Sequence, residues 1–553
     1  MEIGPFTQSN FSGGLNLYLQ DSHVADDEYF MGFNLRNRDG SIIPTRSYTK
    51  LTGAPAGKKQ GLYGFDIYLV LFCAGKAYYK IVGSDTWHLI SGFTMSATAD
   101  RIYAQAVPAS TINFKRKRNE LADATGNSTE SNISVDPTLN VNGTEAGLVC
   151  QDGVTQPRLI LSNGNARATQ AYGTWADGAR EYVPIGLQMT YLNGILFVVS
   201  PDKKKILRSV TGRPLDFVVN IDTAGLKGGD ADTTSHKVSY DDINFIGSLN
   251  TGELLVGTSK ALFPVELNYN ELFFGEPTFN NRPLIEAGIV NQFSMVELLG
   301  DTAFIDFNGM RSFNAVQQLN NEGRSSILSK KVEKLFVDVR QTAGATCAMV
   351  FDNYAFFAVN SSFGYLTLVY DMLSSVWCSM DFIDSVPVMQ FGVVNLSDEQ
   401  QIYCINSNGD VYKLYDLNQN YSAAMLFPKT RIIQENLKKG LKLKGVRTLF
   451  VDGLSEDSAT VTSFIDGERK TRIVQTLRDT TGGIAFPVYY PVMFDSKSKV
   501  NNLLFNFTGI AGAGTKIGCS ISWSNDARLV EFQMDAEDVD TVASQKQQQQ
   551  VYL

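Results

Sequence analysis

The feature that most constrains the fold of this 553-residue chain is a repeated pattern of short apolar runs closed by turn residues. The runs are rich in Val, Ile, Phe and Tyr, and pairs such as Ala74-Gly75, Asn308-Gly309 and Asn408-Gly409 separate neighbouring runs. Such runs and turn pairs are typical of strands joined in hairpins, whereas long helical periodicity is almost absent. The pattern predicts an all-β fold built mainly from antiparallel strands.

From residue 61 onward the apolar runs group into units of about 25 to 50 residues, a period typical of repeat architectures. The units lie at residues 61–93, 186–217, 243–267, 286–316, 345–381 and 401–415. Radial repetition of small sheets hides their edges, so the pattern predicts an irregular β-propeller of about six blades. Two stacked β-sandwiches are the alternative, since no unit carries a strong WD or kelch signature.

Changes in composition along the chain predict its division into regions. A polar stretch rich in Asn, Thr and Ser interrupts the repeats, longer alternating strands follow residue 425, and the last residues are polar and of low complexity. The expected regions are an N-terminal arm with first strands at 1–60, a propeller at 61–93 and 184–424, an insertion at 94–183, a C-terminal β-sandwich at 425–540 and a flexible tail at 541–553.

Composition narrows the classes of function. Hydrophobic residues make up 44% and charged residues 19%, which favours a folded chain. The net charge of −9 argues against a protein whose main task is coating nucleic acid, because that task needs a basic surface. The longest apolar run has about eight residues where a membrane helix needs about twenty, so no segment is expected to span a bilayer.

The sequence offers little for catalysis. It holds three histidines, lacks a G-x-S-x-G motif and has no pair of cysteines at the spacing of a metal site. Carboxylates at Asp241-Asp242, Asp381 with Asp384, and Asp535 to Asp540 are candidates for glycoside hydrolysis, but solvated turn residues are the plainer interpretation. We therefore predict a protein that is not an enzyme, with no catalytic, cofactor-binding or metal-binding residue and no cofactor.

Two segments are candidate contact sites. Five basic residues form a possible patch for docking an acidic neighbour or touching DNA phosphates, with a solvated surface as the alternative: Lys438, Lys439, Lys442, Lys444 and Arg447. Near the N-terminus, five residues combine anchoring side chains with permissive glycines, which suits an arm docked on its own propeller or on a neighbour, with a plain turn as the alternative: Phe11, Gly13, Gly14, Leu15 and Asn16.

Several motifs, taken in order, resemble the tail nozzle proteins of short-tailed bacteriophages, also called tail tubular protein B-like or tail hub proteins. The matching pieces are Phe11 to Asn16, the acidic Asp26-Asp27-Glu28, Gly40 to Arg46, a blade ending at Leu207 to Phe217, Asp306 to Arg311, and Val369 to Asp371 with Trp377. The resemblance spans about residues 6 to 416 in scattered pieces.

The resemblance implies a structural role in the virion tail. It implies a closed homohexameric ring below portal and adaptor, through which genomic DNA leaves without specific binding during viral genome delivery, with adaptor proteins and tail fibres as partners. The resemblance also implies a podovirus as the source and assembly of the protein in the host cytoplasm. The alternatives are another tail hub or ring protein, or a β-propeller that binds or, less favoured, cleaves carbohydrate.

Overall fold

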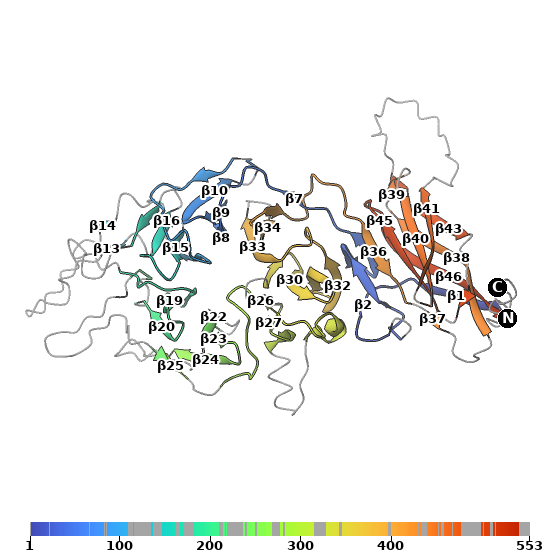
Figure 1. Cartoon of the computed structure of the whole chain (residues 1–553), viewed down its shortest axis with the longest axis horizontal. Coiled ribbons are helices and arrows are strands. Elements are labelled where there is room, and N and C mark those ends of the chain that lie inside the picture. The colour runs from blue at the N-terminus through green and yellow to red at the C-terminus, as the bar shows by residue number, and fades with distance from the viewer. Residues whose placement is uncertain are drawn as a thin grey trace, which may run out of the picture.

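The computed structural model describes, with short internal gaps, residues 2–108, 146–169, 182–217, 241–313, 328–432, 439–476 and 499–540, and the short strands at 114–115, 134–135 and 236–237. The described part is almost entirely β, in agreement with the predicted fold class (Figure 1). Its one helix is the short 3-10 helix η3 (Leu328–Leu335), and no helix in these ranges is long and apolar enough to cross a membrane.

Seven small antiparallel sheets follow one another along the described chain. The first three consist of β8 (Lys59–Phe65), β9 (Tyr68–Cys73), β10 (Lys76–Ile81) and β11 (His88–Leu89); β12 (Tyr103–Pro108), β15 (Ala146–Gln151), β16 (Arg158–Leu161) and β17 (Ala166–Ala168); and β18 (Met189–Leu192), β19 (Ile195–Val199), β20 (Lys205–Arg208) and β21 (His236–Lys237). A separate hairpin joins β13 (Phe114–Lys115) to β14 (Ser134–Val135).

The other four sheets complete the series. They consist of β22 (Ile243–Ser248), β23 (Leu254–Thr258), β24 (Leu262–Leu267) and β25 (Pro277–Phe279); β26 (Met295–Leu298), β27 (Asp301–Asp306) and β28 (Gly309–Ser312); β29 (Cys347–Phe351), β30 (Tyr354–Ser361), β31 (Gly364–Asp371) and β32 (Val376–Asp381); and β33 (Val388–Asn395), β34 (Gln400–Asn406) and β35 (Val411–Lys413) with β7 (Thr49–Lys50).

The series of sheets closes into a ring. The first strands of most neighbouring sheets contact one another in chain order, hydrogen bonds between Gln292 and Ile246 join the fourth sheet to the fifth, and β33 of the last sheet contacts β8 of the first. In the last sheet the N-terminal strand β7 supplies the fourth strand, pairing Lys50 with Tyr412 and Thr49 with Lys413. Residues from both ends of the repeat region therefore share one sheet.

Glutamine side chains join neighbouring sheets of the ring. The Gln390 amide donates to the Leu62 carbonyl at 2.7 Å and accepts from the Leu62 N–H at 3.2 Å. Gln292 makes the same two bonds with Ile246. Each amide supplies one donor and one acceptor. It therefore bonds to both the N–H and the carbonyl of one residue in the neighbouring sheet, which would otherwise be buried without partners.

Aromatic side chains meet across the middle of the ring. Phe293, which precedes β26, lies 6.1 Å from the Tyr103 ring of the second sheet and 6.2 Å from the Tyr63 ring of the first. The Arg101 guanidinium lies 4.8 Å from the Phe293 ring centre. Side chains from sheets that are not neighbours thus pack together at the centre.

Two larger sheets form the other end of the molecule (Figure 1). The 7-stranded sheet contains β1 (Glu2–Gln8), β5 (Leu35–Arg38), β6 (Ser41–Pro44), β38 (Lys439–Val451), β43 (Leu503–Thr508), β44 (Ala513–Gly514) and β46 (Arg528–Asp540). The 10-stranded sheet extends β29–β32 by β4 (Met31–Phe33), β36 (Ala424–Phe427), β37 (Arg431–Ile432), β40 (Ser458–Ile465), β41 (Glu468–Thr476) and β45 (Lys516–Trp523). Short pairs join β2 (Gly14–Leu15) to β3 (Glu28–Tyr29) and β39 (Gly453–Leu454) to β42 (Lys499–Val500).

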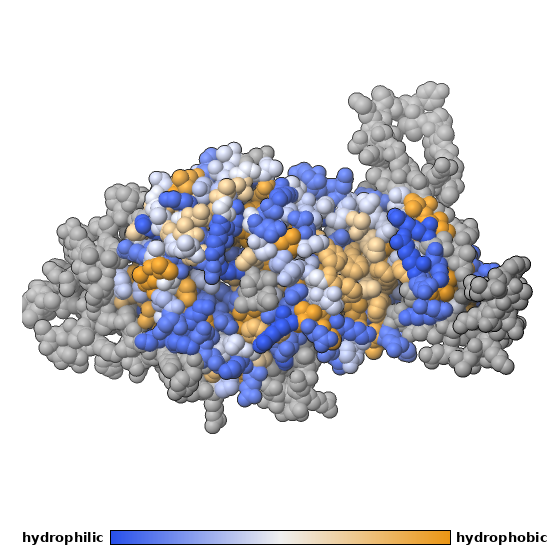
Figure 2. Space-filling model, in the orientation of Figure 1, coloured by the Kyte–Doolittle hydropathy of each residue, from blue (hydrophilic) through white to orange (hydrophobic). Residues whose placement is uncertain are grey.

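These two sheets share one core with the sixth sheet of the ring. Phe450 and Met534 of the 7-stranded sheet belong to the same buried cluster as Ile521 of the 10-stranded sheet and Trp377 of the ring. Figure 2 shows an apolar surface patch at this junction. Met425 of β36 is among the exposed large hydrophobic residues. The strands after residue 425 therefore pack face to face as expected of a sandwich, but they are continuous with the ring.

Two expectations about organisation differ from the structure, and a third falls outside the described residues. The ring has seven sheets among the described residues, where about six were predicted, because the expected insertion at 94–183 supplies β12, β15, β16 and β17. The region 1–60 is not a separate arm, since β1 pairs with β46 and β7 with β35. The expected tail at 541–553 lies outside the described residues.

Candidate functional site

Two cavities open on opposite faces of the ring. In an antiparallel sheet, the turn after the first strand and the turn after the second lie at opposite ends. The cavity that we call the arginine cavity is lined by Asp352 and Asn353, which form the turn after the first strand of the sixth sheet. The cavity that we call the polar cleft is lined by Ser259 and by Phe307, which lie in turns after second strands.

The arginine cavity is the larger of the two, with a volume of about 860 Å³. It lies where β5 and β6 meet the sixth and seventh sheets of the ring. Its floor and walls include Arg36, Phe351, Tyr354, Phe356 and Tyr415. A concave site with mostly apolar walls and a few polar groups is the usual form of a small-molecule site.

A buried ion pair lies at the floor of this cavity. The Arg36 Nη2 donates to Asp381 Oδ2 at 2.8 Å, and Nη1 donates to Asp381 Oδ1 at 3.3 Å. Tyr415 donates its hydroxyl to Oδ2 at 2.7 Å, and Ser379 donates to Oδ1 at 2.5 Å. Each oxygen of Asp381 therefore accepts two hydrogen bonds, and all four donors come from the protein itself.

Aromatic rings surround the Arg36 guanidinium. The ring centres of Tyr354, Phe356 and Tyr415 lie 5.4, 5.5 and 4.9 Å from its central carbon. Burial by itself lowers the pKa of Arg36, but the neighbouring Asp381 carboxylate outweighs burial and raises it above its ordinary value. Burial raises the pKa of Tyr354 to about 12, so this hydroxyl is protonated and can donate a hydrogen bond at neutral pH.

The rim of the arginine cavity is polar and exposed. Arg38, Asp352, Asn353 and Gln400 are exposed rim residues for which the described chain shows no side-chain partner. Leu373 is also on the rim and is 68% exposed. The rim thus offers planar hydrogen-bonding groups beside aromatic and aliphatic walls.

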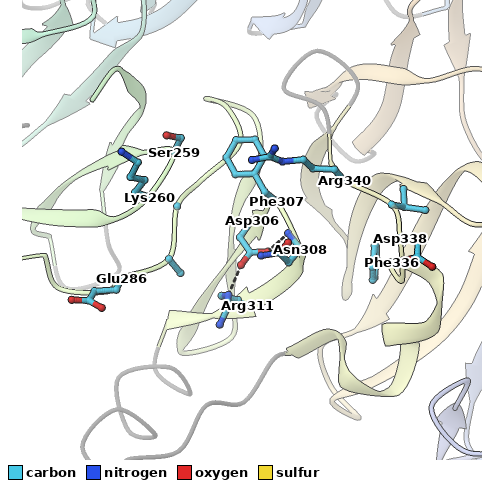
Figure 3. Close-up of a pocket in the computed structure, with 13 residues that line it drawn as sticks. Ser259, Lys260, Glu286, Asp306, Phe307, Asn308, Arg311, Phe336, Asp338 and Arg340 are labelled. Carbon is cyan, nitrogen blue, oxygen red and sulfur yellow. Dashed lines mark hydrogen bonds and ion pairs between the residues drawn. The ribbon is translucent and has the colours of Figure 1, made fainter. Parts of the chain in front are cut away.

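The polar cleft has a volume of about 600 Å³ and lies between the fourth and fifth sheets (Figure 3). The Asp306 carboxylate accepts from the Asn308 N–H at 2.7 Å and pairs with Arg311 Nε at 2.5 Å. This arrangement stabilises the Asn308-Gly309 turn. Gly288 fixes the other wall, because a Cβ there would lie 2.0 Å from the Ser259 carbonyl oxygen.

The predicted docking residues at the N-terminus lie inside the protein. Phe11 and Leu15 are fully buried in the core shared by the ring and the larger sheets. Gly14 has a φ of +73°, and a Cβ there would lie 2.5 Å from the Trp377 carbonyl oxygen. The Gly13 N–H donates to Asp27, and the Asn16 amide donates to Glu28 Oε2 at 2.7 Å. The segment is thus held by its own chain.

Most of the predicted basic patch faces acids that the sequence places far away. Lys442 and Lys444 lie 3.6 and 2.9 Å from Glu537 of β46, and Arg447 lies 3.7 Å from Asp535. Lys439 begins β38, and Lys438 lies outside the described residues. The patch is therefore largely balanced by the neighbouring strand.

The candidate carboxylates are also engaged. Asp241 pairs with Lys260 and Asp242 with Lys204. Asp384 accepts a hydrogen bond from the Tyr412 hydroxyl. In the described ranges, no three His, Cys, Asp or Glu side chains gather as a metal site would require.

Sequence reasoning missed Arg36 and Tyr415, although a signal for the cavity was present. The motif from Gly40 to Arg46 was singled out for its resemblance, and Gly40, Ile43 and Arg46 line the arginine cavity. Asp381 was also singled out, and it forms the ion pair at the floor. The sequence does not reveal that these segments meet.

Comparisons with known proteins assign neither a family nor an activity to the chain. No family model and no curated protein matches the chain. The chain is similar to an X-ray structure described as a "putative gluconolactonase", with 9% sequence identity, a TM-score of 0.31, and coverage of 69% of this chain and 93% of that chain. A likeness this low assigns no activity to this chain.

The comparison nevertheless contradicts the predicted tail nozzle role. The protein found similar is described as a gluconolactonase and not as a component of a phage tail. The motifs that suggested the role also have local structural reasons: Phe11 and Trp377 are core residues, and Asp306 stabilises a turn. The nozzle role is therefore not retained, whereas the predicted ring of copies and the other predicted partners are tested by none of these findings and stay predictions.

Proposed function

We propose that the closed series of sheets is a seven-bladed β-propeller and that the protein binds a saccharide in the arginine cavity without cleaving it. The observation that carries the proposal is the combination of aromatic walls with a rim of planar polar side chains. The C–H faces of a sugar ring pack on aromatic rings such as Tyr354 and Tyr415. Neighbouring hydroxyls suit the paired donors and acceptors of Gln400 and Asn353.

The hydrogen bonds that Asp381 already accepts favour a binding site over a catalytic one. Asp381 already accepts four hydrogen bonds, from Arg36, Ser379 and Tyr415, so it has no free lone pair directed at a ligand. A general acid or base must reach the proton that it transfers. Asp381 instead keeps the Arg36 guanidinium in place, and Arg36 in turn holds the three rings that shape the wall.

The test is a glycan array probed with the full-length chain, followed by calorimetric titration of the best glycan. Gln400→Ala at the exposed rim and Tyr354→Ala at the wall are each expected to weaken binding by about tenfold, equivalent to about 1.4 kcal/mol. Asn308→Ala, on the opposite face, is the matched control and should bind as the natural chain does. Absence of any bound glycan, or equal binding by all three variants, would refute the proposal.

A further inference from the structure

We propose that the polar cleft is a second ligand site, which takes a short peptide by its free amino and carboxylate groups. This inference is independent of saccharide binding, because the cleft lies on the opposite face of the ring. It rests on the placement of charged side chains around the Phe307 ring (Figure 3).

One wall of the cleft presents a cation. The Arg340 guanidinium lies 5.3 Å from the centre of the Phe307 ring, over its face. Within the described ranges no acidic side chain pairs with Arg340, which is exposed. Stacking on a ring leaves the edge of a guanidinium open, and that edge can donate two parallel hydrogen bonds to a carboxylate.

The opposite wall presents an anion. Glu286 is exposed and has no cationic partner among the described residues. It lies two residues before Gly288, whose close approach to Ser259 fixes this wall. Figure 3 shows Glu286 and Arg340 on opposite sides of Phe307. The cleft therefore holds Glu286 and Arg340 on opposite sides of an aromatic ring, and the exposed Asp338 of the same lining also has no cationic partner among the described residues.

The paired charges below them are already satisfied. Arg311 is bound to Asp306, and their side chains are only 18% and 6% exposed. A ligand with a single charge would complement one wall and leave the other charge without a partner. A short peptide complements both walls, and an aromatic side chain on it can also pack on Phe307. The volume of the cleft suits a ligand of this size.

The experiment compares charge changes in the ligand with charge changes in the protein. The probes are glycylphenylalanine, its N-acetyl derivative and its C-terminal amide, titrated into the full-length chain and followed by saturation-transfer NMR. Each blocked probe should bind about fivefold more weakly than the free dipeptide, the size of one partly exposed ion pair. Glu286→Gln should abolish the preference for the free amine, and Arg340→Gln the preference for the free carboxylate.

Glu333→Gln is the matched control, since Glu333 lies on η3 and does not line the cleft. It should leave both preferences intact. The proposal is overturned if no probe binds at millimolar concentration, or if Glu286→Gln and Arg340→Gln weaken all three probes equally. A saccharide bound in the arginine cavity should not displace the dipeptide. The two binding proposals can therefore fail independently of one another.

Discussion

The guanidinium of Arg36 and the carboxylate of Asp381, 345 positions apart in the chain, form a two-pronged ion pair with 2.8 Å between Nη2 and Oδ2. Only 8% and 4% of these side chains are exposed. The pair joins β5, which belongs to the 7-stranded sheet, to β32 of the ring. It therefore fixes the position of the N-terminal segment against the wall of the arginine cavity.

Neutralising Asp381 should destabilise the protein strongly. Asp381→Asn leaves the Arg36 charge buried without its counter-charge, which typically costs about 3–5 kcal/mol of unfolding free energy. Urea unfolding of the full chain, followed by tryptophan fluorescence, measures the loss. Glu468→Gln, which removes an exposed ion pair with Lys470, should cause no measurable change. Equal stability of Asp381→Asn and the natural chain would contradict this account of the cavity floor.

Glu28 should make stability depend on acid. Burial by itself raises the pKa of Glu28, but hydrogen bonds from Lys331, the Ala25 N–H and Asn16 outweigh it and leave the pKa below its ordinary value. The stabilisation is therefore complete above the ordinary glutamate pKa of about 4.3 and is lost as the pH falls through the lower folded value. The difference in Tm between the natural chain and Glu28→Gln should be largest at neutral pH and vanish in strong acid. A difference that grows below pH 4 would refute the assignment.

Removing the Gln390 side chain should loosen the closure of the ring. Gln390→Ala leaves the buried N–H and carbonyl of Leu62 without partners, which costs about 1–3 kcal/mol. Hydrogen exchange in β8 should accelerate more than exchange in β19, which lies elsewhere in the ring. Gln105→Ala, whose amide bonds to the neighbouring Ala106 carbonyl and to no other group in the described part of the chain, serves as the control. Unchanged exchange in β8 would show that closure does not depend on this amide.

Two glycines at the same contact should respond differently to a methyl group. A Cβ at Gly64 would lie 1.6 Å from the Val393 carbonyl oxygen, whereas the nearest atoms to a Cβ at Gly392 lie 3.6 Å away. Gly64→Ala must push β8 from β33, so we expect a loss of about 3 kcal/mol or more. Gly392→Ala should stay within about 1 kcal/mol of the natural chain. Thermal unfolding of both variants measures this difference. Similar Tm values for the two variants would contradict the close approach of Gly64 to Val393.

Local patterns were predictable from the sequence, and pairings between distant segments were not. The turns at Ala74-Gly75 and Asn308-Gly309 lie where their residues indicated, since turn conformation depends on neighbours in the chain. The second sheet was assigned to an insertion because β12 and β15 pair across a long polar stretch. Likewise, Lys444 looked unopposed because Glu537, its partner, is distant in sequence.

In the two cavities, likewise, single residues or motifs could stand out in the sequence, but the meeting of distant segments could not be predicted. Asp381 and the Gly40 to Arg46 motif each stood out alone, but their meeting depends on how β5 and β6 cross the ring. Arg340 and Glu286 carry no sequence signal at all, because an exposed charge in a loop is the commonest kind of residue there. Only the packing of the fourth and fifth sheets brings these two to one cleft.

The strand that closes the ring has a consequence for synthesis of the protein. Thr49 of β7 donates its hydroxyl to Asp416, 367 residues later in the chain, next to the strand that β7 pairs with. At synthesis rates of about 5–20 residues per second, β7 emerges about 20 to 70 s before its partner. For most of that interval β33 is also absent, so β8 lacks its contact with the last sheet of the ring. The nascent chain therefore passes through a period in which β7 and β8 both lack their later partners. A chaperone that binds exposed strands is expected to act mainly during this period.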